Sequence, residues 1–282
     1  MVLLALFGAV MGQGVVWYTG QFYAQNFLET KCNIEFEQSR TIMLWAIAFA
    51  TPFFILWGWL SDKIGRKWIM MAGMALAIFT YRPIFSTFLK DSDPVNWNAK
   101  YKATLTKADI EKYGKNGLSF FNLTKIDTTH INDTTKITTT RCIFPAGEAV
   151  TLITTDITHS SEAVNKESNT VFSNKHLSKS IYWKFVGLVF LLILYVTMVY
   201  GPIAAFLVEL FPTKIRYTSM SLPYHIGNGV FGGLVPFIGL LLTTTYPADP
   251  LVGLWYPIGV ATLCLVIGTM YLTNKIDGNV KD

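Results

Sequence analysis

The chain has 282 residues, of which 51% are hydrophobic, 15% aromatic and only 15% charged, and its mean hydropathy is +0.38. This composition excludes an ordinary soluble domain of the same length. The net charge of +5 does not indicate nucleic acid as a partner, because the basic residues lie mostly in loops and do not gather with aromatics on one polar face. We therefore expect the lipid bilayer as a partner.

Six apolar runs predict six transmembrane helices. Each run is close to the ~20 residues that cross a bilayer, and backbone groups in lipid must form their hydrogen bonds within the segment. The runs cover residues 2–27, 41–60, 68–88, 182–210, 218–242 and 251–273. The sequence thus predicts an all-α membrane protein with helices in 1–88 and 181–282 and an external loop of ~90 residues, 89–180, between them.

The first run, 2–27, begins without the charged segment of a secretory signal, so we interpret it as a mature transmembrane helix. Gln13, Trp17 and Gln21 recur every four residues and form one stripe, with Tyr18 beside it. Polar side chains in a bilayer usually face protein or water. The stripe is therefore a candidate cavity lining, and the alternative is hydrogen bonding between helices with aromatic filler.

A charged turn, GWLSDKIGRK, joins the second and third runs. Gly58 allows two helices to approach closely, and Asp62 suits the N-terminus of a neighbouring helix. Gly65 permits a sharp reversal. Arg66 and Lys67 hold the turn on the cytoplasmic side. The alternative is an ordinary hairpin oriented only by its positive charge.

The segment 89–180 is polar and rich in threonine, as in TTHINDTTKITTT. A small lid-like domain and a mostly disordered insertion are both open interpretations, although ~90 residues without structure would be unusual. Residues 108–113 favour a helical turn, and 142–155 alternate enough for one or two strands. Cys32 and Cys142 both lie on the external side, where a disulfide between them is permitted.

The fourth run contains a polar position near its middle. Tyr200 lies eleven residues before Phe211, about 16 Å along a helix, and is a second candidate for the cavity. Gly201 and Pro202 follow it and would interrupt the backbone hydrogen bonds, which predicts a kink. The kink suits either a flexible gating helix or a static bend.

Charged residues collect at one end of the predicted bundle. Glu209 lies seven residues before Arg216 at the end of the fourth run, and Asp62 and Arg66 project from the charged turn. These groups predict an ionic network that forms and breaks, since exposed pairs are individually weak. The alternative is orientation of the chain by positive charge alone.

The fifth run offers His225 and Asn228, which lie on nearly the same side of a helix. Histidine can carry a proton at physiological pH, and the alternative is a hydrogen-bonded structural histidine. The repeats Gly8/Gly12 and Gly229/Gly233 predict close helix packing.

Three segments carry a resemblance to a known family. The turn GWLSDKIGRK resembles the signature loop of the major facilitator superfamily of transporters. YGPIAAFLVELFPTKIRYTSM and SLPYHIGNGVFGG resemble the tenth helix and the segment after it in the metabolite:H+ symporter branch, which contains proline/betaine, shikimate and 2-oxoglutarate permeases. GQGVVWYTGQFYA resembles that branch's seventh helix.

The resemblance implies the C-terminal six-helix half of a twelve-helix fold, with helices seven to nine in 1–88 and ten to twelve in 181–282. It also implies proton-coupled symport of a small polar metabolite, an organic acid or a betaine or amino acid, across the plasma (bacterial inner) membrane. The partners would be the substrate, protons and an N-terminal six-helix half. In this family the charges at the inner face stabilise the outward-facing state.

Other interpretations stay open. The chain could be a fragment, a split-gene product or the result of a misassigned start codon. An inactive permease fragment and a receptor-like sensor using the external loop are the alternative functions. This half offers no carboxylate in the middle of a run, so we expect the proton-coupling acid in the other half. No Cys/His spacing indicates a metal, and we expect neither a cofactor nor an enzyme.

The short loops predict the topology. Seven basic residues fall on one side (Lys63, Arg66, Lys67, Lys214, Arg216, Lys275 and Lys281), and only Lys31 and Arg40 fall on the other. The positive-inside rule then places 89–180 outside and the C-terminus in the cytoplasm.

In a background without the native cysteines, an impermeant thiol reagent should label Ser119→Cys and not Asn279→Cys. The reverse pattern would contradict the assignment.

Overall fold

The computed structural model describes residues 1–104, 122–132, 135–144, 146–158 and 166–273. The chain divides into two compact units. The helix unit consists of Met1–Phe27, Thr41–Ser86 and Phe185–Asp282, and the sheet unit consists of Leu28–Arg40 and Thr87–Lys184. The predicted helical turn at 108–113 and the basic residues of the tail, Lys275 and Lys281, lie outside the described residues.

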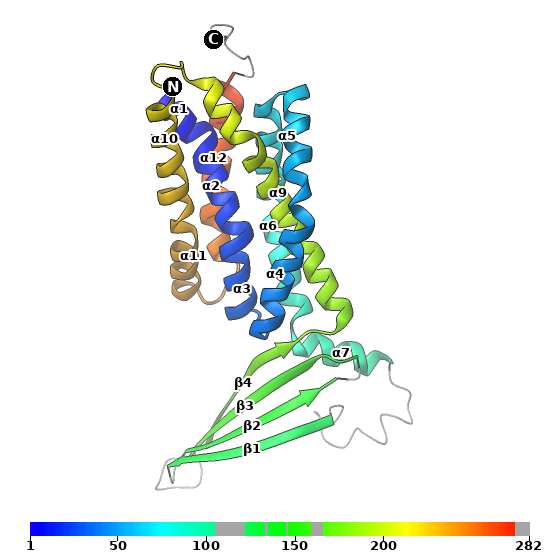
Figure 1. Cartoon of the computed structure of the whole chain (residues 1–282). Helices are drawn as coiled ribbons and strands as arrows, with labels where there is room; N and C mark the ends of the chain where they lie inside the picture. The colour runs from blue at the N-terminus through cyan, green and yellow to red at the C-terminus, as the bar shows by residue number, and fades with distance from the viewer. Residues whose placement is uncertain (105–121, 133–134, 145, 159–165, 274–282) are drawn as a thin grey trace. The chain divides into compact units, whose positions relative to one another are not determined.

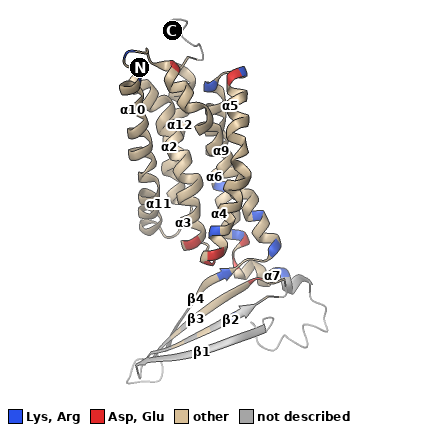
Figure 2. Cartoon of the chain, in the orientation of Figure 1, with Lys and Arg blue, Asp and Glu red and all other residues tan. Residues whose placement is uncertain are grey.

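Six helices within the described part of the chain are long and apolar enough to cross a membrane, which confirms the predicted all-α membrane fold. They are Val2–Thr30, Phe36–Ile64, Arg66–Asp91, Lys179–Leu210, Arg216–Thr245 and Val252–Tyr271. Five of the six extend beyond the predicted apolar runs, because helical hydrogen bonding continues into the polar flanks. Charged residues gather near the helix ends (Figure 2).

The helices contain several local irregularities. The elements are α1 (Val2–Ala5), η1 (Leu6–Val10), α2 (Met11–Tyr18), η2 (Thr19–Tyr23), α3 (Ala24–Thr30), α4 (Phe36–Ala50), α5 (Pro52–Ile64), α6 (Arg66–Asp91), α9 (Lys179–Leu210), α10 (Arg216–Ile226), η3 (Gly227–Gly232), α11 (Leu234–Thr245), η4 (Val252–Leu254) and α12 (Trp255–Tyr271). Pro52, which lacks a backbone N–H, separates α4 from α5. Pro202 lies inside α9, which continues through it as one helix.

Three wide π-helical segments, η1, η2 and η3, interrupt the first and fifth helices. The two helices run side by side in Figure 1, and their backbones touch. A Cβ on Gly14 would lie 2.6 Å from the Gly227 carbonyl oxygen, and one on Gly232 would lie 2.6 Å from the ring of Tyr18. Glycine is therefore required on both sides of this contact.

The predicted glycine repeats have different outcomes. Gly12 packs as expected, because a Cβ there would lie 2.7 Å from the sulfur of Cys264. Gly229 faces open space, and Gly227 and Gly232 make the close approach instead. The π-helical turn changes the rotation per residue, so a repeat spaced for an α-helix misplaces the packing face.

The sheet unit contains an antiparallel meander of four strands in the order β1-β2-β3-β4 (Figure 1). The strands are β1 (Asn122–Asn132), β2 (Thr135–Ile143), β3 (Ala149–Thr158) and β4 (Lys166–His176), and α7 (Pro94–Thr104) precedes them. The strand signal at 142–155 therefore corresponds to the end of β2 and most of β3. The all-α description applies to the helix unit. In the sheet unit the threonine-rich sequence forms strands, because β-branched residues favour them.

Cys32 is a free thiol buried in the sheet unit, so it forms no disulfide with Cys142, a pairing that the sequence left open. Burial raises the pKa of the Cys32 thiol to about 12, while a hydrogen bond from Ser92 and the charge of Lys175 act in the opposite direction. The thiol is thus shielded from solvent and is mostly in its protonated, less reactive form.

We predict that Gly227→Ala destabilises the helix unit by roughly 1–3 kcal/mol, the usual cost of overpacking. The new methyl group would lie 2.6 Å from Val10 Cγ1 and 2.9 Å from the Val10 carbonyl carbon. Gly229→Ala is the matched control in the same π-helical segment, because nothing lies within 4 Å of that position. Thermal unfolding in detergent measures both, and equal midpoints for the two variants would contradict the assigned contact.

Candidate functional site

A pair of side-chain amides joins the first and fifth helices. Gln13 in α2 is fully buried, and its Nε2 donates to Asn228 Oδ1 at 3.0 Å. Asn228 Nδ2 donates back to Gln13 Oε1 at 3.3 Å and to the Tyr224 carbonyl oxygen at 3.0 Å. Asn228 lies in η3, and π-helical turns are frequent at functional sites. The two amides are the centre of the candidate site.

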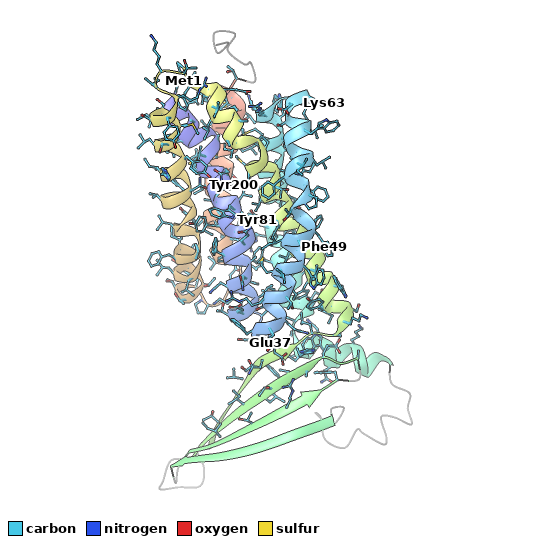
Figure 3. All side chains as sticks on the ribbon, in the orientation of Figure 1. Met1, Glu37, Phe49, Lys63, Tyr81 and Tyr200 are labelled. Carbon is cyan, nitrogen blue, oxygen red and sulfur yellow. The ribbon has the colours of Figure 1, made fainter. Side chains whose placement is uncertain are left out.

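Tyr200 brings the fourth helix to this centre. Its hydroxyl donates to Asn228 Oδ1 at 3.3 Å, and the residue lies midway along the helices in Figure 3, well away from Lys63 at one end. The Trp17 ring packs edge-on against Tyr200 with centroids 5.3 Å apart. Trp17 Nε1 donates to Gln21 Oε1 at 2.8 Å, so two of the three residues of the predicted stripe are in contact.

Aromatic rings form one side of the site. Tyr18 lies 5.0 Å from Trp17, and Phe22 lies 5.9 Å from Trp17 and 5.1 Å from Tyr18, centroid to centroid. The sequence analysis did not include Phe22, although its spacing of four residues from Tyr18 was a usable signal. Half-buried rings beside buried amides can bind a small molecule with polar groups and an apolar body.

The structure does not bring His225 to this centre. His225 is exposed on α10 and packs edge-on against Tyr224, with centroids 5.9 Å apart. Asn228, three residues later, is buried against Gln13. The prediction that His225 and Asn228 share a face assumed a regular α-helix, and η3 begins between them.

At one end of the helix unit the predicted charges meet. Gly65 has φ = +96°, a conformation that favours glycine, which confirms the sharp reversal between α5 and α6. Arg66 Nη1 lies 2.6 Å from Glu209 Oε1, and Arg66 Nη2 lies 3.2 Å from Asp62 Oδ1. The exposed fractions of the Arg66, Glu209 and Asp62 side chains are 20%, 24% and 65%. The pair between α6 and α9 is thus the better shielded of the two.

Lys67 makes a contact that the sequence analysis did not predict. Its side chain is buried, and Nζ donates to the carbonyl oxygens of Thr269 at 2.8 Å and Leu272 at 2.6 Å. These oxygens belong to the C-terminal end of α12, where a helix has unsatisfied acceptors and partial negative charge. Lys67 therefore caps the last helix.

Arg216 and Gly58 also differ from expectation. Arg216 Nε donates to the Phe211 carbonyl oxygen at 3.1 Å rather than to Glu209. A Cβ on Gly58 would meet nothing within 4 Å, so the close approach expected of Gly58 does not occur within the described residues. Those residues also contain no group of three or more His, Cys, Asp and Glu that could hold a metal ion.

Two comparisons with known proteins gave partial matches, both to proteins named for metabolite transport. Part of the chain is similar to the inner membrane metabolite transport protein YhjE of Escherichia coli K12, with 39% identity over 49 residues, which cover 17% of this chain and 11% of that protein. Part of the chain is also similar to a putative metabolite transport protein of Haemophilus influenzae, with 36% identity over 101 residues, or 30% of this chain and 21% of that protein. The matches therefore span about a fifth or less of these relatives. No family model and no solved structure matches.

We predict unequal coupling energies at the charged turn. A double-mutant cycle of Arg66→Ala and Glu209→Ala should give about 1 kcal/mol, and the cycle of Arg66→Ala and Asp62→Ala below about 0.5 kcal/mol, because solvent screens the exposed pair. Chemical unfolding of the four variants of each cycle in detergent supplies the numbers. A larger coupling for Asp62 than for Glu209 would overturn the assignment.

Proposed function

We propose that this chain supplies six helices of a secondary transporter for a small polar metabolite. The observation that carries the proposal is the hydrogen-bonded centre of Gln13, Asn228 and Tyr200 halfway along apolar helices. Buried polar groups are costly inside a membrane and are commonly retained for substrate or ion pathways. The two relatives named as metabolite transport proteins support the same interpretation.

The binding chemistry of this centre favours a ligand with hydrogen-bonding groups. Gln13 and Asn228 bond each other twice and are both buried, whereas Tyr200 makes one bond to Asn228 and is only half-buried. The Trp17 and Tyr18 rings beside it are also half-buried. We therefore assign substrate contact to Tyr200 and the rings, and positioning of Tyr200 to the amide pair.

The remaining helices of the transporter would come from a second six-helix unit. In such a transporter the site residues of this chain would line one side of a cavity, and the resemblance to the major facilitator superfamily implies a facing half that closes it. In this proposal the transporter lies in a plasma membrane, with 89–180 outside and the C-terminus in the cytoplasm.

Proton-coupled symport of an organic acid, betaine or amino acid is part of the proposal. The centre formed by Gln13, Asn228 and Tyr200 contains no carboxylate, and His225 lies apart from it. We therefore assign the group that carries the coupled proton to the second unit. The ion pair of Arg66 with Glu209 would act as a latch, because an interaction made in one state only shifts the population toward that state.

Uptake into liposomes under a proton gradient tests the function. The chain alone should transport neither proline, betaine nor dicarboxylates, because it supplies one side of the cavity. The complete transporter, with both six-helix units, should take up at least one of these compounds. Uptake by the chain alone would refute the need for a second unit, and failure of the complete protein on a broad metabolite panel would refute transport.

We predict that Tyr200→Phe in the complete transporter raises KM about fivefold with kcat nearly unchanged, since a lost hydrogen bond of ~1 kcal/mol affects bound substrate and transition state alike. Tyr256→Phe is the matched control, because it also removes one tyrosine hydroxyl. That hydroxyl donates to the Phe231 carbonyl oxygen at 3.0 Å, and neither residue is among those assigned to the site. Equal changes in KM for the two variants would argue against substrate contact by Tyr200.

A further inference from the structure

The connection between the first and second helices is attached to the edge of β4 in the sheet unit. Lys175 N donates to the Asn33 carbonyl oxygen at 2.8 Å, and Glu35 N donates to the Lys175 carbonyl oxygen at 2.9 Å. These bonds form an isolated parallel bridge between Ile34 and Lys175. Asn33 has φ = +53°, which asparagine tolerates better than most residues. The connection thus behaves as a short added strand.

Gln38, at the start of α4, has a defined amide orientation. Leu177 N donates to Gln38 Oε1 at 2.7 Å, and Gln38 Nε2 donates to the Leu177 carbonyl oxygen at 3.1 Å. A rotation of the amide by 180° would place donor against donor and acceptor against acceptor. The two bonds therefore keep the amide nitrogen on its present side.

This orientation determines the protonation state of His176. His176 Nε2 lies 3.1 Å from Gln38 Nε2, which can only donate, so the ring nitrogen must accept. The ring proton is then on Nδ1, which donates to Glu35 Oε2 at 2.7 Å. A proton added to His176 Nε2 would face the amide N–H groups of Gln38. The observed arrangement consequently requires a neutral imidazole.

The surrounding charges act in both directions. Glu35 favours a protonated His176, whereas Arg141 from β2, whose Nη2 lies 3.2 Å from Glu35 Oε1, neutralises part of that attraction. Lys175 precedes His176 in β4 and is buried near Cys32 and Asp93, and burial lowers the pKa of Lys175. The His176 side chain is 41% exposed, so solvent protons reach it.

We propose that Gln38, His176 and Glu35 form a proton-binding site that holds the helix connection to β4 at neutral pH and releases it in acid. The closed arrangement binds one proton fewer than the open one, so acid favours opening. Imidazole is the side chain that ordinarily changes charge between about pH 5 and 8. On protonation, Gln38 has to give up either His176 or its paired bonds with Leu177.

The site is placed to act on several membrane helices. Gln38 lies in the first turns of α4, and α9 begins at Lys179, three residues after His176. α3 ends at Thr30, shortly before the bridged residues. Acid would therefore loosen the shared attachment of three helix ends. The inference is independent of the transport proposal, because it concerns the sheet unit alone.

Hydrogen–deuterium exchange of the whole chain in lipid nanodiscs tests the proposal. After correction for intrinsic exchange, protection of the Leu177 amide, whose acceptor is Gln38 Oε1, should fall about tenfold between about pH 8 and about pH 5.5. The Phe144 amide, which donates to the Glu148 carbonyl oxygen at 2.7 Å in the same unit, is the reference and should not change. Equal Leu177 protection at the two pH values would overturn the proposal.

Three variants identify the titrating group. His176→Phe should remove the pH response of Leu177, and His225→Phe, the matched control in α10, should keep it. Gln38→Glu should reverse the response, because a carboxylate accepts from both the Leu177 N–H and a protonated His176. A response that persists in His176→Phe would overturn the proposal. Should His176→Phe fail to fold, a Gln38→Glu protein that still loses Leu177 protection in acid would overturn it equally.

Discussion

The direct backbone contact between the first and fifth helices is the constraint on which the candidate site depends. A Cβ on Gly14 would lie 2.6 Å from the Gly227 carbonyl oxygen, so the two backbones approach more closely than any other residue type allows. Only at this separation can the short side chain of Asn228 reach Gln13. Each amide then satisfies the other where both side chains are buried, and an unpaired amide there would cost several kcal/mol. The close packing of the two helices is thus what allows polar side chains to be buried at this site.

Local features of this structure could be predicted from the sequence. The Gly65 turn, the contact of Asp62 with Arg66 and the spacing of Trp17 and Gln21 involve residues at most four positions apart, where periodicity and turn chemistry decide the outcome. The meeting of Arg66 with Glu209 also agreed with expectation, because both charges had to lie at helix ends on one side of the membrane. The predicted apolar runs located all six helices for the same reason: lipid imposes length and composition on each run independently.

Features that depend on the exact helical rotation or on distant packing could not be predicted. The π-helical turn η3 has no clear sequence signal. It places His225 and Asn228 on different faces of the fifth helix, and it makes Gly227 the packing position instead of Gly229. Lys67 stands next to Arg66 in the sequence, and nothing in the sequence indicates that its side chain extends in another direction. Its hydrogen-bond acceptors lie more than 200 positions away, at the end of α12. Cys32 is buried near Ser92 and near Lys175 of β4, a strand that the sequence did not delimit.

The added strand at residues 33–35 has a consequence for how the sheet meets other polypeptides. An antiparallel meander has two edges whose free N–H and C=O groups can pair with a foreign strand. Here the bridge to Ile34 occupies the outer edge of β4 at Lys175 alone, while among the described residues β1 pairs only with β2. A foreign strand on β4 would therefore be confined to the residues before Lys175, whereas one on β1 would meet no such obstacle within the described residues.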